Sequence, residues 1–502
     1  MNRLDPRNAD QCPKTSAGAR MLGPAGPRRP GRILPAVTVV AVVVAVVTTG
    51  WCLRLLRQQA ADRPVLVAPA ATQPAAVVDA GSASARPDRI VLTWTGDPRT
   101  ELTVTWRTST LVSGSHAEIA VAQAGPGFKE STRRVEAGSM PFQSDRGEYL
   151  IHTATFNGLQ PGTHYLYRVG HDEDASEWFA CRTAPAEPEP FCFLYLGDVQ
   201  NDIRPMWPRV LRRAFAAAPD AAFQLYAGDL INRAQRDEEW GEWFDAGGGL
   251  HACVPVIATP GNHEYFSEKT EDGKSVKRLG PHWRAHFAFP ENGPPGLEET
   301  VYWIDCQNLR IVSLNTNERQ AEQAAWLETA LSGRRPTWTV ATFHHPIFAL
   351  ARDRDSSALR ELLQPVLERH GVDLVLTGHD HVYGRTELMM PSGGVVGEGA
   401  SPGTVYVVSV GGPKMYALAD DRPVPIRRRA EDTQLFQVIS IDGAVLHYEA
   451  RTALGDLYDA FTLTRLPDGR KELTDRIPDT PERRRPRPTS AEGEKAGART
   501  DD

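Results

Sequence analysis

Three apolar runs within residues 191–264 decide the fold: FCFLYLGDVQ (residues 191–200), AFQLYAGDLIN (222–232) and VPVIATPGNHE (254–264). Each run is rich in residues that favour buried strands, and each contains a glycine followed by a polar residue near its end. Two stretches with helical character separate the runs, WPRVLRRAFAAA (207–218) and residues 238–247. Strands that alternate with helices in this way are typical of the α/β class.

The same alternation continues toward the C-terminus. Strand-like runs follow at LRIVSLNTN (309–317), WTVATFHHP (338–346), VDLVLTGHDH (372–381) and TVYVVSVGG (404–412). Helical patterns lie at residues 321–331 and 359–370, and hairpin-like runs end the pattern near residue 465. We therefore predict one α/β domain over residues 190–466. Residues 467–502 are charged and rich in proline, which predicts a disordered tail.

A different pattern precedes this domain. Between residues 87 and 186, short runs such as ELTVTWRT (101–108) alternate apolar and polar residues with period two. Such runs predict half-buried strands, and their spacing between turn residues predicts a small all-β sandwich. The segment GLQPGTHYLYRV (158–169) resembles a fibronectin type III domain.

The N-terminus contains an uncharged apolar run at residues 33–53. At about 1.5 Å per residue, a helix of this length crosses a hydrocarbon core of about 30 Å. We predict a transmembrane anchor, with a cleaved signal peptide as the alternative. Residues 1–32 are predicted to be a disordered basic segment, and residues 54–86 an Ala/Pro-rich spacer. The longer basic stretch before the run favours an extracytoplasmic main domain, membrane-anchored or secreted.

Composition narrows the classes of function. The chain has 502 residues and a formal net charge of -7. Its basic residues form only short runs in the sequence, which argues against a nucleic-acid partner. None of its six cysteines forms a CxxC pair, so a thiolate zinc site is not expected. Cys181 and Cys192 flank a proline-rich junction, and they either form a disulfide or remain buried thiols.

Five polar motifs each follow an apolar run. The carboxyl ends of strands in α/β sheets meet at one crevice, so we expect these side chains to converge. Carboxylate, amide and imidazole donors suit hard-to-borderline cations, and one carboxylate can bridge two metals about 4 Å apart. The candidate residues are Asp198, Gln200, Asp229, Asn232, Asn262, His263, His344, His345, His379 and His381.

The order of these motifs resembles GDxG, GDxxY, GNH(D/E), VxxH and GHxH of the purple acid phosphatases, which are calcineurin-like metallophosphoesterases. The likeness extends to HWRAHFAFPENG (282–293) and GHDHVYGRT (378–386), and covers about residues 88–465. It implies a layered β-sandwich with helices outside, preceded by the smaller sandwich.

The resemblance also implies a role for each matching residue. Asp229 would bridge two metal ions, with Asp198 and His381 on the first ion. The second ion would be held by Asn262, His344 and His379. A hydroxide held by the metals would attack phosphorus in line. His263 would contact the phosphate and protonate the leaving oxygen, or serve as a structural histidine beside the ligands.

Two positions depart from the family pattern. Gln200 replaces the last glycine of GDxG, and is either a neutral ligand of the first metal or a support for its neighbours. Asn232 replaces the tyrosine ligand, and we expect it to orient a ligand or the substrate. His345 either contacts the substrate or packs beside His344.

Hydrolysis of phosphate monoesters is therefore the leading hypothesis, with two cofactor metal ions, divalent Fe, Mn or Zn, and a small phosphorylated substrate as the partner. Phosphodiester or nucleotide hydrolysis would use the same donors. A non-catalytic surface binding module is the alternative from another class. The sequence predicts neither the physiological substrate nor the oligomeric state.

Overall fold

The structure, a computed structural model, describes residues 81–333, 336–390, 402–420 and 424–486. The expected anchor at residues 33–53 and the segment before it lie outside this range, as does most of the spacer. Within the described ranges, no helix is long and apolar enough to span a bilayer.

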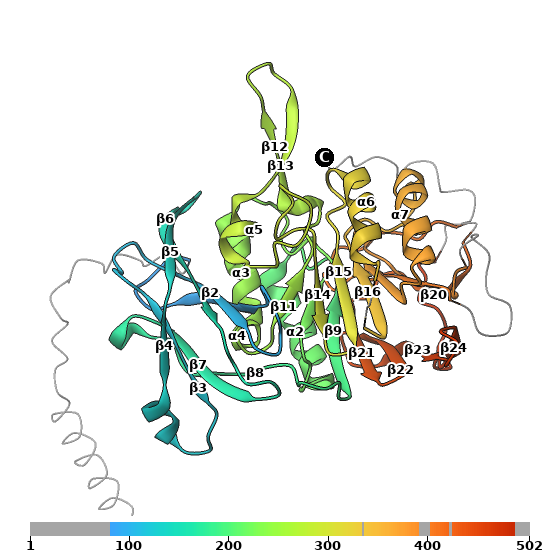
Figure 1. Ribbon diagram of the computed structural model, residues 1–502. Helices are drawn as coiled ribbons and strands as arrows, with labels where there is room; N and C mark the ends of the chain where they lie inside the picture. The colour runs from blue at the N-terminus through green and yellow to red at the C-terminus, as the bar shows by residue number, and fades with distance from the viewer. Residues whose placement is uncertain (1–80, 334–335, 391–401, 421–423, 487–502) are drawn as a thin grey trace, which may run out of the picture. The chain divides into compact units, whose positions relative to one another are not determined.

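The N-terminal region is built from two four-stranded antiparallel sheets (Figure 1). Burial alternates with period two from His164 to Val169, as expected from the sequence. Every residue from Leu102 to Thr108 is buried, so the half-buried strand predicted at residues 101–108 is wrong. One sheet has the order β1 (Asp88–Thr93), β2 (Leu102–Thr108), β6 (Gly147–Phe156) and β5 (Gly138–Ser144). The other has the order β4 (Arg133–Glu136), β3 (His116–Val121), β7 (His164–Gly170) and β8 (Phe179–Arg182).

Two seven-stranded sheets form the larger region. The first has the order β11 (Val256–Ala258), β10 (Gln224–Tyr226), β9 (Phe191–Leu196), β21 (Leu435–Asp442), β22 (Val445–Thr452), β23 (Leu457–Arg465) and β24 (Lys471–Asp475). The second has the order β14 (Tyr302–Cys306), β15 (Leu309–Ser313), β16 (Trp338–Thr342), β17 (Leu374–Thr377), β19 (Val405–Val408), β18 (Tyr383–Thr386) and β20 (Ile426–Ala430). Strands β9, β10 and β11 run parallel, as do β15, β16, β17 and β19.

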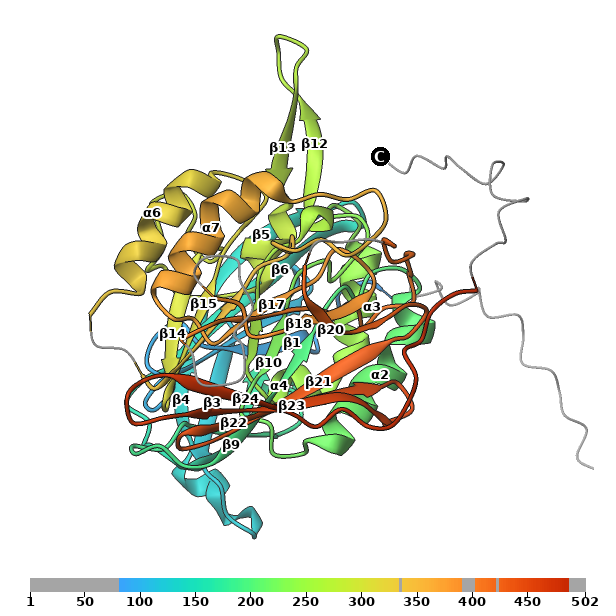
Figure 2. The same cartoon turned by 90° about the vertical axis from the view of Figure 1, so that its right-hand side faces the viewer.

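The sheets share one core, because apolar residues of both, such as Phe193 and Val340, belong to one buried cluster. Helices α2 (Ile203–Ala217), α3 (Asp237–Gly247) and α4 (Gly249–Cys253) add Trp207, Trp243 and Ala252 to it. Helices α6 (Gln320–Ala330) and α7 (Ser357–Arg369) lie side by side against the second sheet, over a separate apolar cluster (Figures 1 and 2). Helix α5 (Pro281–His286) is the remaining α-helix of the described ranges. The predicted α/β layering is confirmed.

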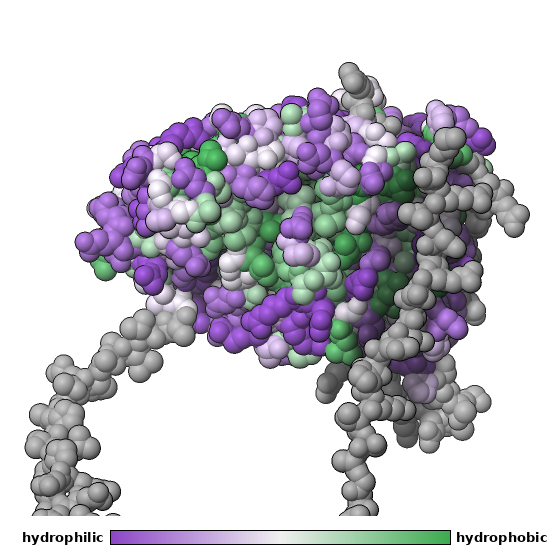
Figure 3. Space-filling model, turned by 90° about the horizontal axis from the view of Figure 1, so that it is seen from below, coloured by the Kyte–Doolittle hydropathy of each residue, from purple (hydrophilic) through white to green (hydrophobic). Residues whose placement is uncertain are grey.

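A hairpin of β12 (Tyr265–Lys269) and β13 (Ser275–Leu279) projects from the body of the larger region (Figures 1 and 2). It follows directly on the third of the opening apolar runs. The opposite face, seen from below in Figure 3, has apolar surface in its middle and hydrophilic residues along its edges. The hairpin therefore stands on the side of the molecule away from this apolar surface.

A buried polar network joins the smaller sandwich to α3. The two terminal nitrogens of Arg89 on β1 donate to the two carboxylate oxygens of Asp237, each at 2.7 Å. Tyr149 on β6 also donates to Asp237, at 2.7 Å, and the His282 ring lies 3.3 Å away. Burial acts to raise the pKa of Asp237, but hydrogen bonds from His282 and Arg89 hold it well below its usual range. Asp237 is therefore a carboxylate shared between the two regions.

The structure corrects the predicted disordered tail. Residues 471–475 form β24, which pairs antiparallel with β23. The ammonium of Lys471 lies 2.9 Å from Asp373, and both side chains are buried. Arg485 donates to Asp432 at 2.7 Å. The charges that suggested disorder are paired, so the assignment of residues 467–486 to a disordered tail is wrong.

Candidate metal centre

The ten candidate residues follow strands of both large sheets. Asp198 and Gln200 follow β9, Asp229 and Asn232 follow β10, and Asn262 and His263 follow β11. His344 and His345 follow β16 on the other sheet, and His379 and His381 follow β17. Parallel strands present their carboxyl ends at one edge of a sheet, so loops from both sheets meet there. The predicted convergence of these motifs is a feature of the fold.

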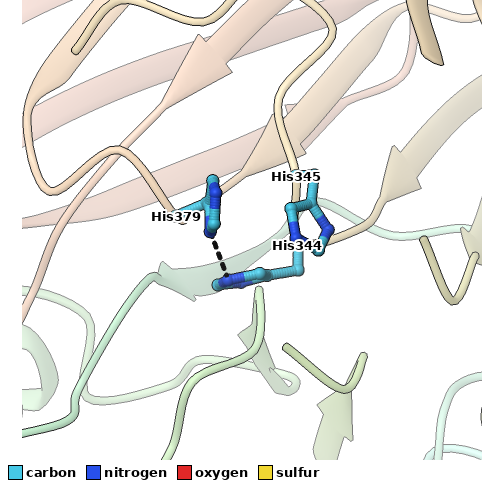
Figure 4. A group of neighbouring side chains, drawn as sticks. All are labelled: His344, His345 and His379. Atoms are coloured by element: carbon cyan, nitrogen blue, oxygen red, sulfur yellow. Dashed lines mark hydrogen bonds between the residues drawn. The ribbon is translucent and has the colours of Figure 1, made fainter. Parts of the chain in front are cut away.

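One half of the cluster gathers around His344 (Figure 4). Its Nε2 lies 3.2 Å from Asp229 Oδ2, 3.0 Å from Asn262 Oδ1 and 3.1 Å from His379 Nδ1. The same His379 nitrogen lies 3.0 Å from Asn262 Oδ1. The other nitrogen of His344 faces the carbonyl of Ala227 at 2.9 Å, which fixes the ring with Nε2 toward the cluster.

The other half gathers around Gln200. Its Nε2 lies 2.9 Å from both Asp229 Oδ2 and His381 Nε2. His381 Nε2 is also 3.7 Å from Asp198 Oδ1. Asp229 Oδ2 therefore stands between the two halves, in contact with a donor from each. The Lys414 carbonyl at 2.9 Å from Nδ1 directs the His381 ring, as Ala227 directs His344.

Backbone strain is concentrated at these residues. Asp198, Asp229, His379 and His381 have φ of 36°, 52°, 73° and 48°, in the left-handed region that non-glycine residues rarely adopt. Crowding requires glycine next to them, because a Cβ on Gly261 would lie 2.1 Å from Asp229 Oδ1. Unfavourable conformations of this kind cluster at functional sites, where the surrounding structure enforces them.

Electrostatics favour a cation in the cluster. Burial opposes charge on His344, but Asp229 raises the pKa of His344 to about 9. Burial also acts to raise the pKa of Asp229, yet the charge of His344 holds it well below the usual range. Burial raises the pKa of Asp198 well above its ordinary value. A proton on His344 thus balances the charge of Asp229, at the position where a cation would place its charge.

The Gln200 side chain supplies a second sign of fit. Its Oε1 is buried and accepts no hydrogen bond. A half turn of the amide exchanges this oxygen with Nε2, and so directs it toward Asp229 and His381. An amide oxygen, two carboxylates and an imidazole are donors suited to divalent cations. The residues present therefore fit a pair of metal ions.

Comparison with known proteins agrees with this geometry. Residues 87–183 match the family model of the purple acid phosphatase N-terminal domain, and residues 191–383 match that of the calcineurin-like phosphoesterases. Residues 191–383 therefore form a calcineurin-like phosphoesterase domain. Members of this family are hydrolases, and the family implies a dinuclear metal centre. The match for residues 87–183 is to the phosphatase domain, and the likeness to fibronectin type III stays a prediction.

Curated relatives include an uncharacterized protein of Mycobacterium tuberculosis, 26% identical over 57% of this chain and 60% of its own length. The chain thus spans less than two thirds of that relative. Human acid phosphatase type 7 is 26% identical over 61% of this chain and 72% of its own length. Among solved structures, the lupin purple acid phosphatase PPD1 superposes with a TM-score of 0.64, at 18% identity, covering 76% of this chain and 75% of that one. This last likeness shows a shared fold.

Asn232 stands where the purple acid phosphatase motif has a tyrosine, and its main-chain carbonyl lies 2.6 Å from His263 Nδ1. The carbonyl accepts from Nδ1, which leaves Nε2 of His263 for the cleft that both residues line. Tyr226, the tyrosine nearest to Asp229 in the sequence, is fully buried and donates to Gln224 at 3.0 Å. It contributes to the core.

His345 lies beside the cluster, with its ring 4.3 Å from that of His379 (Figure 4). Its Nδ1 is 2.8 Å from the Thr316 hydroxyl, which itself accepts from the His345 main-chain nitrogen. With the ring proton on Nε2, the hydroxyl donates to Nδ1; with the proton on Nδ1, the hydroxyl accepts it. Burial lowers the pKa of His345 to about 3, so the ring is neutral at neutral pH.

Several residues near the centre were not identified as site residues from the sequence. Glu264 accepts from the main-chain nitrogens of Asp229, Leu230 and Gly261 at 2.9, 2.8 and 2.6 Å, and so ties two motif loops together. In the sequence, only its position directly after His263 indicated that Glu264 lies near the site. Arg354 donates to the His379 carbonyl at 2.9 Å from a loop outside all five motifs.

Proposed function

We propose that this protein is a dinuclear-metal phosphoesterase that hydrolyses phosphate monoesters. The observation that carries the proposal is the position of Asp229, whose Oδ2 contacts both halves of the donor cluster. Asp198, Gln200 and His381 would hold one ion together with Asp229. Asn262, His344 and His379 would hold the other. When bound, such a pair supplies an activated water as nucleophile and neutralises charge on the phosphoryl oxygens.

The protein's own side chains would do the rest of the work. His263 donates from Nδ1 to the Asn232 carbonyl, so it would protonate the leaving oxygen from Nε2 in its imidazolium form, which carries a proton on both nitrogens. In its Nε2–H tautomer, His345 would be a neutral donor to a phosphoryl oxygen. The Asn232 side chain would line the path to the centre.

Neutral donors at two positions support divalent ions. Gln200 and Asn232 stand where the family has a glycine and an anionic tyrosine ligand, so neither adds negative charge to the site. A less anionic site has weaker preference for a trivalent ion. We propose two divalent ions, Mn²⁺, Zn²⁺ or Fe²⁺.

Phosphodiester or nucleotide hydrolysis is the second candidate. The cleft beside Asn262 and His263 has a volume of about 1060 Å³, which is at the upper end for small-molecule sites. Such a cleft admits a leaving group of nucleotide size. A binding module without activity is disfavoured because the cluster keeps six potential ligands besides Gln200.

The test compares the purified protein with Asp229→Ala and the control Asp468→Ala, an exposed carboxylate in the turn before β24. Metal content is measured by mass spectrometry. Hydrolysis of monoesters, diesters and nucleotides is measured with Mn²⁺, Zn²⁺, Fe²⁺ and Mg²⁺ supplied. We expect Asp229→Ala to lose metal and nearly all turnover, with the control unchanged. Full metal content and ordinary turnover in Asp229→Ala would refute the proposal.

A further inference from the structure

The cleft of about 1060 Å³ extends well beyond the candidate metal centre. The cleft meets the donor cluster at Asn262, which lines it and lies 3.0 Å from both His344 Nε2 and His379 Nδ1, and this is its inner end. Its walls are formed by the loop at residues 232–236, by the hairpin β12–β13 and by residues 413–416. A single phosphate and its contacts would occupy only the inner end, so the remaining walls contact the rest of the substrate.

Positive charge dominates these walls. Among the described residues that line the cleft, Asp202 is the only carboxylate and five residues carry a cationic side chain: Arg233, Arg236, Lys277, Arg354 and Lys414. Two of the five are neutralised by carboxylates outside the cleft. Arg233 pairs with Glu239 at 2.7 Å, and Arg236 pairs with Asp145 at 3.2 Å.

The two lysines differ from these arginines. Across the described ranges, no carboxylate lies within ion-pair distance of Lys277 or Lys414. Lys277 is exposed on β13, opposite Ser267 of β12, which also lines the cleft. Lys414 is half-buried, with its ammonium 5.5 Å from the centre of the Tyr416 ring. Two charges without a carboxylate thus come from separate elements of one cleft.

Arg354 marks the boundary between this outer part and the metal centre. Its guanidinium lies 4.9 Å from the Tyr416 ring, on which Lys414 also rests. It is held 3.6 Å from Asp380 and donates to the carbonyl of His379. Tyr416 in turn lies against His381, with ring centres 4.8 Å apart. The segment that carries Lys414 is therefore connected directly to the candidate ligands.

We propose that Lys277 and Lys414 bind a second phosphate group of the substrate, so that the cleft selects phosphoesters bearing a phosphate remote from the one that is cleaved. This inference rests on the proposed phosphoesterase function. Uncompensated cations in a concave site raise the local concentration of anions and favour a complementary ligand. The positive charge of the lysines lies outside the donor cluster, so it acts on the outer part of the substrate.

The experiment measures kcat/KM for fructose 1,6-bisphosphate and fructose 6-phosphate, with carboxymethyl phosphate as a probe whose second anion is a carboxylate. The variants are Lys277→Met, Lys414→Met and the double variant. Lys274→Met is the matched control, because Lys274 is on the same hairpin, 80% exposed, and paired with Asp272 at 2.7 Å. We expect each variant to lose about 3- to 5-fold in the bisphosphate to monophosphate ratio, the size of an exposed ion pair. The loss should appear in KM, and Lys274→Met should lose none.

Three results would overturn the subsite. The first is an equal loss for both fructose phosphates in the double variant. The second is a loss as large in the control as in Lys277→Met. The third is a preference for the carboxylate probe over the bisphosphate that disappears in the double variant, which would assign the lysines to a carboxylate.

A binding measurement separates this inference from the proposed function. Calorimetry on the metal-loaded protein compares the affinities of fructose 1,6-bisphosphate and fructose 6-phosphate, with turnover monitored in the same samples. If the wild type hydrolyses no ester, the proposed function fails, and the subsite still predicts tighter binding of the bisphosphate that the double variant loses. Equal affinity of the two sugars in the wild type rejects the subsite, whether or not turnover occurs.

Discussion

Replacement of Asp237 by alanine should destabilise the protein by about 3–5 kcal/mol, the usual cost of removing one partner of a buried ion pair. Asp237 and Arg89 are 1% and 3% exposed, so the guanidinium of Arg89 would be left buried without its carboxylate. Arg107, which lies 3.5 Å from Asp237, keeps Asp88 at 2.6 Å and adds little to the cost. The loss therefore comes mainly from one orphaned charge.

The pH dependence follows from the depressed pKa of Asp237. A carboxyl group whose folded pKa lies below its unfolded value of about 3.9 stabilises the protein above that value. Its contribution is lost only as the pH falls through the folded pKa. The difference between wild type and Asp237→Ala should therefore be constant from pH 5 to pH 8.

Urea unfolding followed by tryptophan fluorescence measures this effect, because Trp240 and Trp243 lie on the helix that Asp237 begins. Arg89→Met and the double variant Arg89→Met/Asp237→Ala complete a cycle. We expect the double variant to be more stable than Asp237→Ala alone, since methionine leaves no buried charge. A cost below about 1 kcal/mol for Asp237→Ala, or fully additive effects in the double variant, would refute the reasoning.

Three further outcomes are expected. His263→Ala should keep both metals and lose about 10²–10⁴-fold in rate, with a smaller loss for nitrophenyl phosphate than for alkyl phosphates; an equal loss for both would contradict proton donation. Burial lowers the pKa of His251 to about 3, below its unfolded value of about 6.5, so stability should fall by about 1.4 kcal/mol per unit as the pH drops below 6.5. Urea midpoints at pH 7 and pH 5 should show a weaker pH effect in His251→Phe, and an unchanged effect would assign it to other groups. The iron-loaded, oxidised protein should show no strong visible band, because Asn232 supplies no phenolate; a band that survives in Tyr226→Phe would mean that another tyrosine reaches the metal.

The sequence predicted the site residues that directly follow strands. It did not predict the residues that only tertiary packing brings to the site. Asp198 and Asp229 follow apolar runs that pair as parallel strands, which brings them together. His344 follows an apolar run of the other sheet, so its position beside them also depends on how the two sheets pack. Lys414 and Arg354 belong to loops with no local pattern, and only the folded chain shows that they line the same cleft.

Two other features illustrate the same limit. We expected the side chain of Asn232 to orient a ligand or the substrate. In the structure, the main-chain carbonyl of Asn232 contacts His263. A carbonyl is identical in every residue, so sequence does not reveal such a contact. The sequence did not predict β24 because a lysine is usually exposed to solvent. Lys471 is buried in β24, where Asp373 neutralises its charge.

The candidate ligands come from two different sheets, so bound metal ions would stabilise the contact between the sheets. Asp198, Asp229 and Asn262 follow strands of one sheet, and His344, His379 and His381 follow strands of the other. Ions held by both sets would act as cross-links across the interior, closing loops of more than a hundred residues, such as that from Asn262 to His379 (117 residues apart). Such closures restrict the unfolded chain most when the loop is long. Removal of metal by a chelator should therefore loosen the contact between the sheets as a whole, and amide exchange at β9 and β16 would report it together.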